Sequence, residues 1–173
     1  MSEVPALPSD ATEVLKPDAA SFRSVLGHFA TGITVITAMD GDEPVGIAAN
    51  SFTSVSLDPP LVLFCPATSS TTWPRIQRAG HFMVNVLDEH QEHVSRLFAQ
   101  KGVDRFAEID WTRTERGPIL HDVHAYLDCT IEAEHEAGDH VIVVGRVLEL
   151  GLTADAGPLL FYQGRYGRLL GSA

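Results

Sequence analysis

The sequence predicts a mainly β protein with a few helices, in which antiparallel strands form a closed or split barrel. Strand-like segments outnumber helix-like ones, several pair across short turns as hairpins, and apolar and polar residues alternate over residues 125–134. The chain has 173 residues and no internal repeat, which is typical of one domain. We expect a flexible N-terminal tail over residues 1–17 and one domain over residues 18–170.

The first expected element is a helix that begins near Asp18, which caps it. Its apolar residues recur at helical spacing on one face, at Phe22, Val25, Leu26 and Phe29. Gly32 follows, and a left-handed glycine there would end the helix.

The period then changes to that of strands. Residues 33–39 and 45–50 flank a turn cluster at residues 40–44, which predicts a hairpin. Asp58-Pro59-Pro60 interrupts the next segment, because proline cannot donate to a strand ladder. The apolar run at residues 61–65 is typical of a strand buried on both faces.

The middle of the chain alternates between loops, helices and strands. A hydroxyl-rich loop at residues 67–72 leads into a short helix near Trp73, and residues 81–87 predict another strand. Asp88 and Gln91 resemble a capping box and predict a further helix that ends before Gly102.

The clearest strand pair comes late in the chain. The alternating segment at residues 125–134 is followed by a turn at residues 136–139 and a returning strand at residues 141–150. Residues 159–162 form a last short strand.

Composition disfavours several classes of partner. The net charge is -11, from 12 basic and 23 acidic side chains, which disfavours binding to nucleic acid and to anionic membranes. No segment approaches the roughly 20 apolar residues of a membrane span, and the first residues lack the pattern of a secretory signal. Cys65 and Cys129 lie in apolar runs, where two buried free thiols suit a cytoplasmic protein; a disulfide between them remains an alternative.

Common catalytic and nucleotide-binding motifs are absent. The sequence has no G-x-G-x-x-G after a strand, no P-loop and no G-x-S-x-G elbow, so a Rossmann fold and a P-loop are unsupported. His90 and His93, like His121 and His124, have spacings that metal sites use, but exposed polar surface is the preferred interpretation and no metal is expected.

Three segments remain open to two interpretations each. The hydroxyl-rich loop at residues 68–72 is either an anion site or a solvated loop. The small side chains of residues 46–56 suit either a flat ligand or close strand packing, and Asn50 and Ser51 offer hydrogen bonds to a heterocycle. His140, beside the Gly138-Asp139 turn, is either a rim residue or part of a site.

In this order, the segments resemble the short-chain flavin reductase family, which often supplies the reductase component of two-component flavin-dependent monooxygenases. The matching segments are residues 22–37, 49–62, 82–87, 104–106 and 138–140. The resemblance implies an antiparallel Greek-key split β-barrel of the FMN-binding kind and an NADH-dependent flavin reductase. It also implies FMN or FAD as flavin, NADH or NADPH as reductant, a homodimer, and a separate oxygenase that receives the reduced flavin.

The resemblance also implies the site residues. Pro44, Val45, Gly46, Ile47, Ala48, Asn50 and Ser51 would line the isoalloxazine, Cys65, Pro66 and Ala67 the ring or ribityl chain, and Thr71 and Thr72 the phosphate, with Phe98 and Lys101 nearby. His140 would be the catalytic residue, and Tyr162 and Tyr166 would line the nicotinamide side with it as cofactor-binding residues. Residues 67–72 contain no basic side chain, unlike several family members, so the phosphate contacts and the choice between FMN and FAD stay open.

Two other functions compete with this one. A different split-barrel oxidoreductase, similar to pyridoxamine-phosphate oxidase, would not need the Gly138-Asp139-His140 arrangement. A non-catalytic flavin-binding module would not oxidise NADH.

Overall fold

The computed structural model describes residues 14–153 and 156–169, so most of the expected tail lies outside the described residues. The helices are α1 (Ala19–Leu26), α2 (Trp73–Ala79) and α3 (Glu92–Ala99). The strands are β1 (Thr31–Gly32), β2 (Thr34–Asp40), β3 (Glu43–Ala49), β4 (Thr53–Leu57), β5 (Pro60–Phe64), β6 (His81–Val86), β7 (Trp111–Arg113), β8 (Pro118–Leu120), β9 (Ala125–Ala137), β10 (His140–Leu152), β11 (Leu160–Tyr162) and β12 (Arg165–Gly167).

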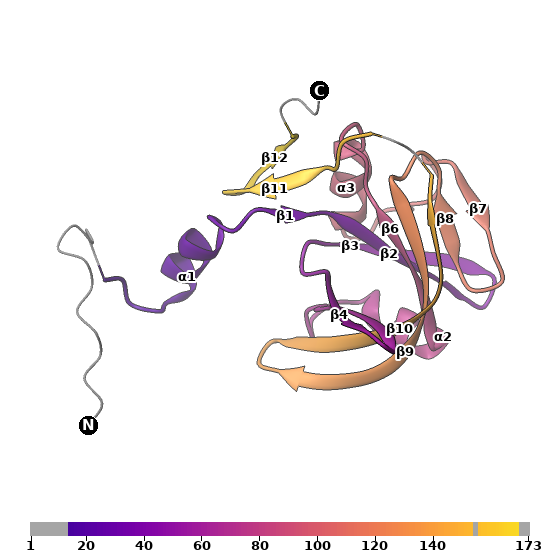
Figure 1. Ribbon diagram of the computed structural model, residues 1–173, viewed down its shortest axis with the longest axis horizontal. Coiled ribbons are helices and arrows are strands. Elements are labelled where there is room, and N and C mark those ends of the chain that lie inside the picture. The colour runs from indigo at the N-terminus through magenta and orange to yellow at the C-terminus, as the bar shows by residue number, and fades with distance from the viewer. Residues whose placement is uncertain (1–13, 154–155, 170–173) are drawn as a thin grey trace.

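Seven of these strands form one antiparallel sheet in the order β3-β2-β6-β9-β10-β5-β4 (Figure 1). The hairpin β2–β3 lies at one edge and the hairpin β4–β5 at the other, and the chain then returns to pair β6 with β2. This non-consecutive order confirms the predicted antiparallel barrel-like class. The two free edges belong to β3 and β4, which are neighbours in sequence, so the barrel is split between them.

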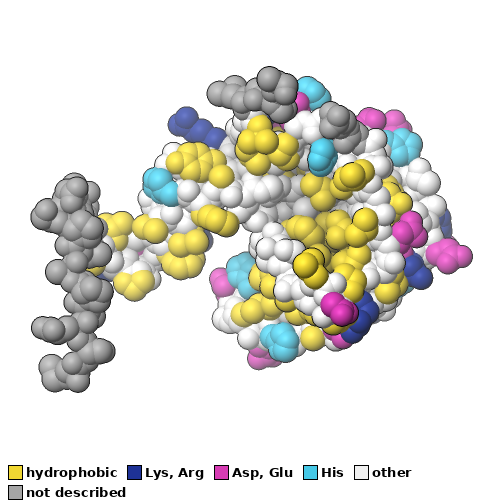
Figure 2. Space-filling view, viewed as in Figure 1, with side chains coloured by type: hydrophobic (Ala, Val, Ile, Leu, Met, Phe, Trp, Pro, Cys, Tyr) yellow, Lys and Arg dark blue, Asp and Glu magenta, His cyan; other side chains and the backbone are white. Residues whose placement is uncertain are grey.

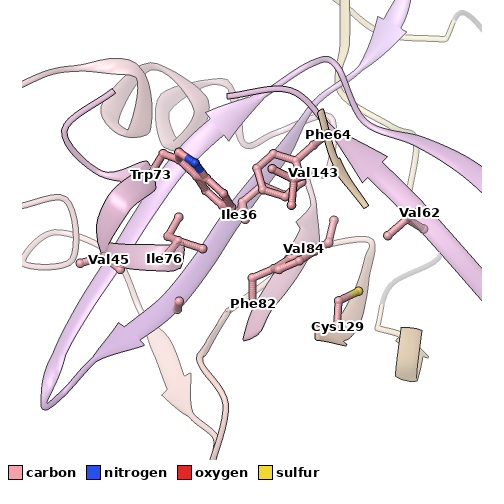
Figure 3. Packing of buried hydrophobic residues seen from close by; sticks show 11 residues of the cluster. Ile36, Val45, Val62, Phe64, Trp73, Ile76, Phe82, Val84, Cys129 and Val143 are labelled. Carbon is pink, nitrogen blue, oxygen red and sulfur yellow. The ribbon is translucent and has the colours of Figure 1, made fainter. Parts of the chain in front are cut away.

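The sheet wraps around one of two apolar clusters. Ile36, Val45, Phe64, Phe82 and Val143 come from five different strands and all lie in this cluster (Figure 3). The α2 helix adds Trp73 and Ile76, which explains why it lies against the strands rather than in solvent. A second cluster on the other side of β2 and β3 packs α3 and the β7–β8 hairpin against the sheet.

The first helix differs from its prediction in where it ends and in what its apolar face contacts. Asp18 caps it as predicted, because its Oδ1 accepts from the amides of Ala20 and Ser21. The helix ends at Leu26 with Gly27 in a right-handed conformation, and Gly32 lies in β1, so the prediction that Gly32 closes the helix was wrong. None of its residues is buried, and the helix projects from the barrel (Figure 1).

The remaining helix and strand predictions hold in outline, with shifts. In β5 only Val62 and Phe64 are buried, so the expectation of a strand buried on both faces was wrong. The α3 helix begins at Glu92, later than the predicted capping box suggests. The side chain of Gln91 accepts the amide of Asp88, and the side chain of Asp88 accepts the amide of His90, so these residues form a turn before the helix. Strands β4, β7, β8 and β12 are short and were not predicted. Among the described residues no helix is long and apolar enough to cross a membrane.

Candidate functional site

The free edge of β3 presents backbone groups to the split in the barrel. Thr34 on β2 donates its hydroxyl to the carbonyl of Ala49 at 3.0 Å, so Ala49 faces β2. The carbonyl of Gly46 instead accepts from Arg105 and faces the open side. Because successive residues of a strand point their hydrogen-bonding groups to opposite sides, Ala48 shares the direction of Gly46. The amide and carbonyl of Ala48 therefore point into the split.

The loop between β5 and α2 runs along this open edge, and we call the space between them the seam. At one end the hydroxyl of Ser51 accepts the amide of Cys65 at 2.9 Å. At the other end Nη1 of Arg105 donates to the carbonyl of Gly46 at 2.8 Å and to Oγ1 of Thr72 at 3.0 Å. At about 3.3 Å per residue, the seam extends for roughly 16 Å between Gly46 and Ser51.

Arg105 brings a positive charge with no carboxylate partner among the described residues to the Thr72 end of the seam. Its acceptors are neutral: Thr72, the carbonyl of Gly46, and the carbonyl of Gln100, which takes bonds from Nε and Nη2. Asp104 lies next to it in sequence, but its carboxylate accepts the amide of Phe106 instead. Desolvation lowers the pKa of Arg105, yet a guanidinium stays charged at neutral pH.

The other arginine near Thr72 is already neutralised. Arg75 forms ion pairs of 2.6 Å with both Asp40 and Glu43, and these hydrogen bonds raise its pKa. Partial burial of a cation costs free energy unless an anion pairs with it. Arg105 is therefore the cation placed to receive an anionic group of a ligand, and a phosphate beside Thr72 fits this requirement.

His140 lies beside the middle of the loop that borders the seam. The β9–β10 turn is bound to this loop because Thr68 donates its amide to the carbonyl of Asp139 and Val141 donates to Pro66. A bridge pairs His140 with Ala67 directly. The Nδ1 of His140 lies 2.7 Å from Oδ1 of Asp139, and this hydrogen bond is the main reason why the pKa of Asp139 is lowered. Asp139 thereby orients the imidazole, and Nε2 has no hydrogen-bond partner within the described residues.

Most of the predicted cofactor-binding residues fall along the seam and at its two ends. A cavity of about 560 Å³ at the Arg105 end is lined by Pro44, Val45, Gly46 and Thr72, among others. A smaller cavity of about 170 Å³ includes Ala48, Asn50 and Tyr166. Cys65, Pro66 and Ala67 border the seam through their contacts with Ser51 and the β9–β10 turn, while Thr71 is exposed in the same loop.

Four predicted residues have other surroundings. Phe98 is 1% exposed and lies behind Gly46, where a Cβ at that position would come 2.6 Å from the Phe98 ring. Lys101 is exposed in the loop after α3 and does not line the larger cavity. Tyr166 hydrogen-bonds Ser95 at 3.0 Å, and Tyr162 makes an edge-to-face contact with His28. Phe98 thus packs against β3 at Gly46. Tyr166 contacts α3 through Ser95, whereas Tyr162 contacts His28.

The two thiols are free, in keeping with the simpler interpretation of the sequence. Burial raises the pKa of Cys129 to about 12, since it lies in the barrel core. Cys65 is only half-buried, contrary to the expectation of two buried thiols, and burial also raises its pKa. Neither thiol has the lowered pKa of a cysteine nucleophile.

Sequence reasoning did not assign a role to Arg105, although it noted the Asp104-Arg105-Phe106 segment. Arg105 contacts Thr72 and Gly46, which lie about 30 and 60 positions earlier in the chain, and no local sequence pattern predicts such contacts. The histidine pairs contribute no site in the described ranges 14–153 and 156–169, where no group of three or more His, Cys, Asp or Glu is placed to hold a metal ion.

Fold and seam together define a class: an antiparallel split barrel with a cationic end and a histidine beside the same groove. A family model described as "Flavin reductase like domain" matches residues 26–170, and the chain belongs to this family.

Known proteins with a related sequence or structure match this chain along most of its length. The reductase subunit HsaB of a flavin-dependent monooxygenase from Rhodococcus jostii is 47% identical over 167 residues, covering 96% of this chain and 85% of the relative. The crystal structure of nitrilotriacetate monooxygenase component B from Mycobacterium thermoresistibile has a TM-score of 0.84 at 45% identity, covering 87% of this chain and 86% of the other. An NADH:FAD oxidoreductase from Streptomyces globisporus, solved with NAD and FAD fragments, has a TM-score of 0.89 at 39% identity, covering 94% and 99%.

Proposed function

We propose that this protein is an NADH-dependent flavin reductase that transfers hydride from NADH to FMN or FAD bound in the seam. The observation that carries the proposal is Arg105, which lies beside Thr72 at one end of an open strand edge and has no carboxylate partner in the part of the chain that the structure describes. The relatives support the same activity, since one is an NADH:FAD oxidoreductase and another is a reductase subunit of a flavin-dependent monooxygenase.

Each part of the seam has a role in this proposal. Arg105 and Thr72 hold the flavin phosphate through charge-assisted hydrogen bonds. The backbone groups of Ala48, with Asn50 and Ser51 beyond them, hold the polar edge of the isoalloxazine, and the amides there favour the negative charge that reduction brings. Cys65, Pro66 and Ala67 border the ring from the opposite side of the seam.

His140 positions the reductant in this scheme. Bound flavin supplies the hydride acceptor, so the chain itself needs to orient two ligands rather than to provide an acid or base. Asp139 fixes the imidazole of His140, and Ala67 beside it belongs to the wall of the flavin site. In this proposal the nicotinamide approaches the ring beside this histidine.

The reduced flavin is passed on to a separate oxygenase in our proposal, as the name of the Rhodococcus jostii relative indicates for that protein. The seam is an open edge rather than an enclosed cavity, which suits a flavin that leaves after reduction. A cytoplasmic location is consistent with two free thiols, because that compartment keeps thiols reduced.

NADH oxidation, followed at 340 nm with purified protein, tests the activity. We expect oxidation only when FMN or FAD is added, and repetition with NADPH ranks the two reductants. A protein that binds flavin but does not oxidise NADH would be a binding module and would overturn the proposal. Oxidation that is independent of added flavin and releases no reduced flavin into solution would contradict transfer to a separate oxygenase.

A homodimer is the second part of the proposal. The apolar face of α1 and of the turn after it is exposed, with Phe22 59% and Phe29 73% accessible, and Figure 2 shows hydrophobic side chains along this projecting segment. An amphipathic helix normally buries this face. The same chain exposes apolar strand residues, among them Leu57, Leu150 and Leu152, on which a second copy of α1 would pack.

Light scattering coupled to size-exclusion chromatography tests the dimer. The wild-type chain should elute at twice its 18.7 kDa mass. Phe22→Glu together with Phe29→Glu should shift it to the monomer, while Leu15→Glu, outside the helix, should leave it dimeric. A monomeric wild-type protein at micromolar concentration would refute this part of the proposal.

A further inference from the structure

A tyrosine from the small sheet β1-β11-β12 forms one wall of the smaller cavity at the β3 edge. Tyr166 lies on β12 and lines this cavity of about 170 Å³ together with Ala48 and Asn50. In the proposed function, Ala48 and Asn50 hold the polar edge of the isoalloxazine. The small sheet is separate from the seven-stranded sheet, so side-chain contacts with the rest of the molecule help to decide where the Tyr166 ring lies.

The α3 helix holds this tyrosine through two consecutive residues. The hydroxyl of Ser95 lies 3.0 Å from that of Tyr166, at hydrogen-bond distance. The guanidinium carbon of Arg96 lies 4.7 Å from the centre of the Tyr166 ring, which is the geometry of a cation–π contact. Figure 1 shows the small sheet next to α3. One contact fixes the end of the phenol and the other fixes the face of its ring, so α3 sets both the position and the tilt of the ring.

Arg96 is itself oriented by a neighbour on the helix. Its Nε and Nη2 lie 2.8 Å and 2.7 Å from Oε1 of Glu92, one turn earlier. An exposed ion pair of this kind adds little to the stability of a helix. It limits the rotamers of Arg96, however, and so keeps the guanidinium over the tyrosine ring. Contacts therefore run without a break from Glu92 on the surface of α3 to Tyr166 in the wall of the cavity.

Ser95 has a position in the helix that serine rarely favours. It lies in the interior of α3, is 3% exposed, and shares the buried face of the helix with Val94 and Phe98. Burial of a hydroxyl costs free energy unless it has a partner, and here the partner is Tyr166. Replacing both partners of a buried hydrogen bond with apolar groups of the same shape is nearly neutral for stability. What this hydrogen bond adds is therefore the direction of the Tyr166 ring rather than stability of the fold.

We propose that Ser95 and Arg96 are positioning residues for hydride transfer, which act by holding the Tyr166 ring beside the bound flavin. The inference rests on the proposed flavin site. In the proposed reaction a hydride passes from NADH, which becomes NAD⁺, to the oxidised flavin, which also takes a proton from water and is thereby reduced. Donor and acceptor must lie within about 3–3.5 Å, and small displacements of the groups around them lower the rate steeply.

The contacts from α3 affect the rate of this step more than the affinity for either ligand. A Tyr166 ring that α3 holds in one place keeps one wall of the site fixed. A ring released from Ser95 turns more freely, so the flavin and the nicotinamide spend less time at the reacting distance although both remain bound. This difference between rate and affinity is what an experiment can measure.

Anaerobic single-turnover reduction tests the inference, because it separates hydride transfer from the release of the flavin. Protein with bound FMN is mixed with NADH at several concentrations, and the loss of flavin absorbance gives the limiting rate constant and the apparent Kd for NADH. We expect Ser95→Ala and Tyr166→Phe each to lower the limiting rate constant roughly tenfold, while the Kd values for FMN and NADH change less than about twofold. A wild-type protein that does not reduce FMN would contradict the proposed function rather than this inference.

The double variant Ser95→Ala/Tyr166→Phe separates positioning from stability. It removes both hydroxyls, so neither is left buried without a partner, and its urea midpoint should stay close to that of wild type. Its rate constant should nevertheless remain about as low as in each single variant, because the two residues act through one contact. A double variant with the wild-type rate would show that the losses came from an unpaired hydroxyl, and a loss equal to the product of the two single losses would show that the residues act independently. Either result would refute the inference.

Arg96 is tested in the same assay against a matched arginine. Arg96→Ala should lower the limiting rate constant about two- to fivefold, the size of one exposed cation–π contact, and Arg96→Lys, which keeps a cation over the ring, should recover most of the loss. Arg113→Ala also removes an exposed, ion-paired arginine, whose partner is Asp42, and should leave the rate unchanged. Equal effects of Arg96→Ala and Arg113→Ala, or wild-type rates in Ser95→Ala and Tyr166→Phe, would overturn the inference.

Discussion

Removal of Arg105 should weaken the binding of phosphorylated flavins specifically. In Arg105→Ala the guanidinium that faces Thr72 is lost, and with it a charge-assisted hydrogen bond to phosphate. Such bonds contribute about 1.5–3 kcal/mol, and a tenfold change in affinity corresponds to about 1.4 kcal/mol. Because Arg105 is half-buried rather than fully buried, we expect the lower half of this range, an increase of roughly 10- to 30-fold in the Kd for FMN.

Riboflavin separates this effect from a structural one, since it has the same ring but no phosphate. Arg105 also supports the edge of β3 through its bond to Gly46, so a purely structural role would weaken the binding of every flavin alike. If the phosphate contact dominates, the Kd for riboflavin should change less than about threefold, a difference of under about 0.7 kcal/mol. Arg105→Lys should fall between wild type and Arg105→Ala, because lysine keeps the charge and loses the planar fork.

The assay is titration of flavin fluorescence at low and moderate ionic strength. Arg113→Ala is the matched control, since it removes an exposed cation that pairs with Asp42 on the surface. It should change neither Kd. Equal losses for FMN and riboflavin in Arg105→Ala, or an equal loss of FMN affinity in Arg113→Ala, would refute the assignment of the phosphate to Arg105.

Three further predictions concern the rest of the seam. His140→Ala should raise the apparent KM for NADH more than it alters the flavin Kd, and unchanged NADH kinetics would remove the histidine from the site. Cys65 should react with a thiol reagent before Cys129, faster as the pH rises toward its raised pKa, and bound flavin should slow this reaction; equal reaction of both thiols in the native protein would contradict their different burial. Gly46→Ala should destabilise the fold by about 1–3 kcal/mol in urea titration, because its Cβ would overlap the Phe98 ring, and adding Phe98→Leu should recover part of the loss.

Local patterns predicted the elements with strong periodicity. The β2–β3 hairpin, the long β9–β10 pair and the cap of α1 by Asp18 follow from spacing and turn chemistry. The short strands β7 and β12 carry three residues each, too few for a period to stand out. A glycine that follows an apolar helix face suits a helix end, which is why the pattern favoured Gly32 as the end of the first helix. The helix ends earlier, at Leu26, and Gly32 lies in strand β1.

The composition of the site depended on contacts that no local pattern records. Ser51 and Cys65 are 14 residues apart, and Thr72 and Arg105 are 33 apart, yet each pair shares a hydrogen bond. The resemblance to a known family supplied most residues along the seam. The resemblance left open which cation would contact the phosphate, because residues 67–72 contain no basic side chain. The fold brings Arg105 from a distant loop to Thr72 at this end of the seam.

The exposed face of α1 illustrates a second limit. Its apolar spacing predicts burial, which does not occur among the described residues of one chain. Sequence periodicity identifies a face that avoids water and does not identify what covers it. The proposed dimer supplies a cover that belongs to another copy of the chain.

A crystal structure of the protein with oxidised FMN tests the location of the flavin most directly. We predict that the phosphate contacts Arg105 and Thr72 and that the polar edge of the isoalloxazine meets the backbone of Ala48, with His140 beside the ring. A flavin bound elsewhere, or one whose phosphate contacts Lys101 and leaves Arg105 without an anion, would contradict the assignment of the seam as the flavin site.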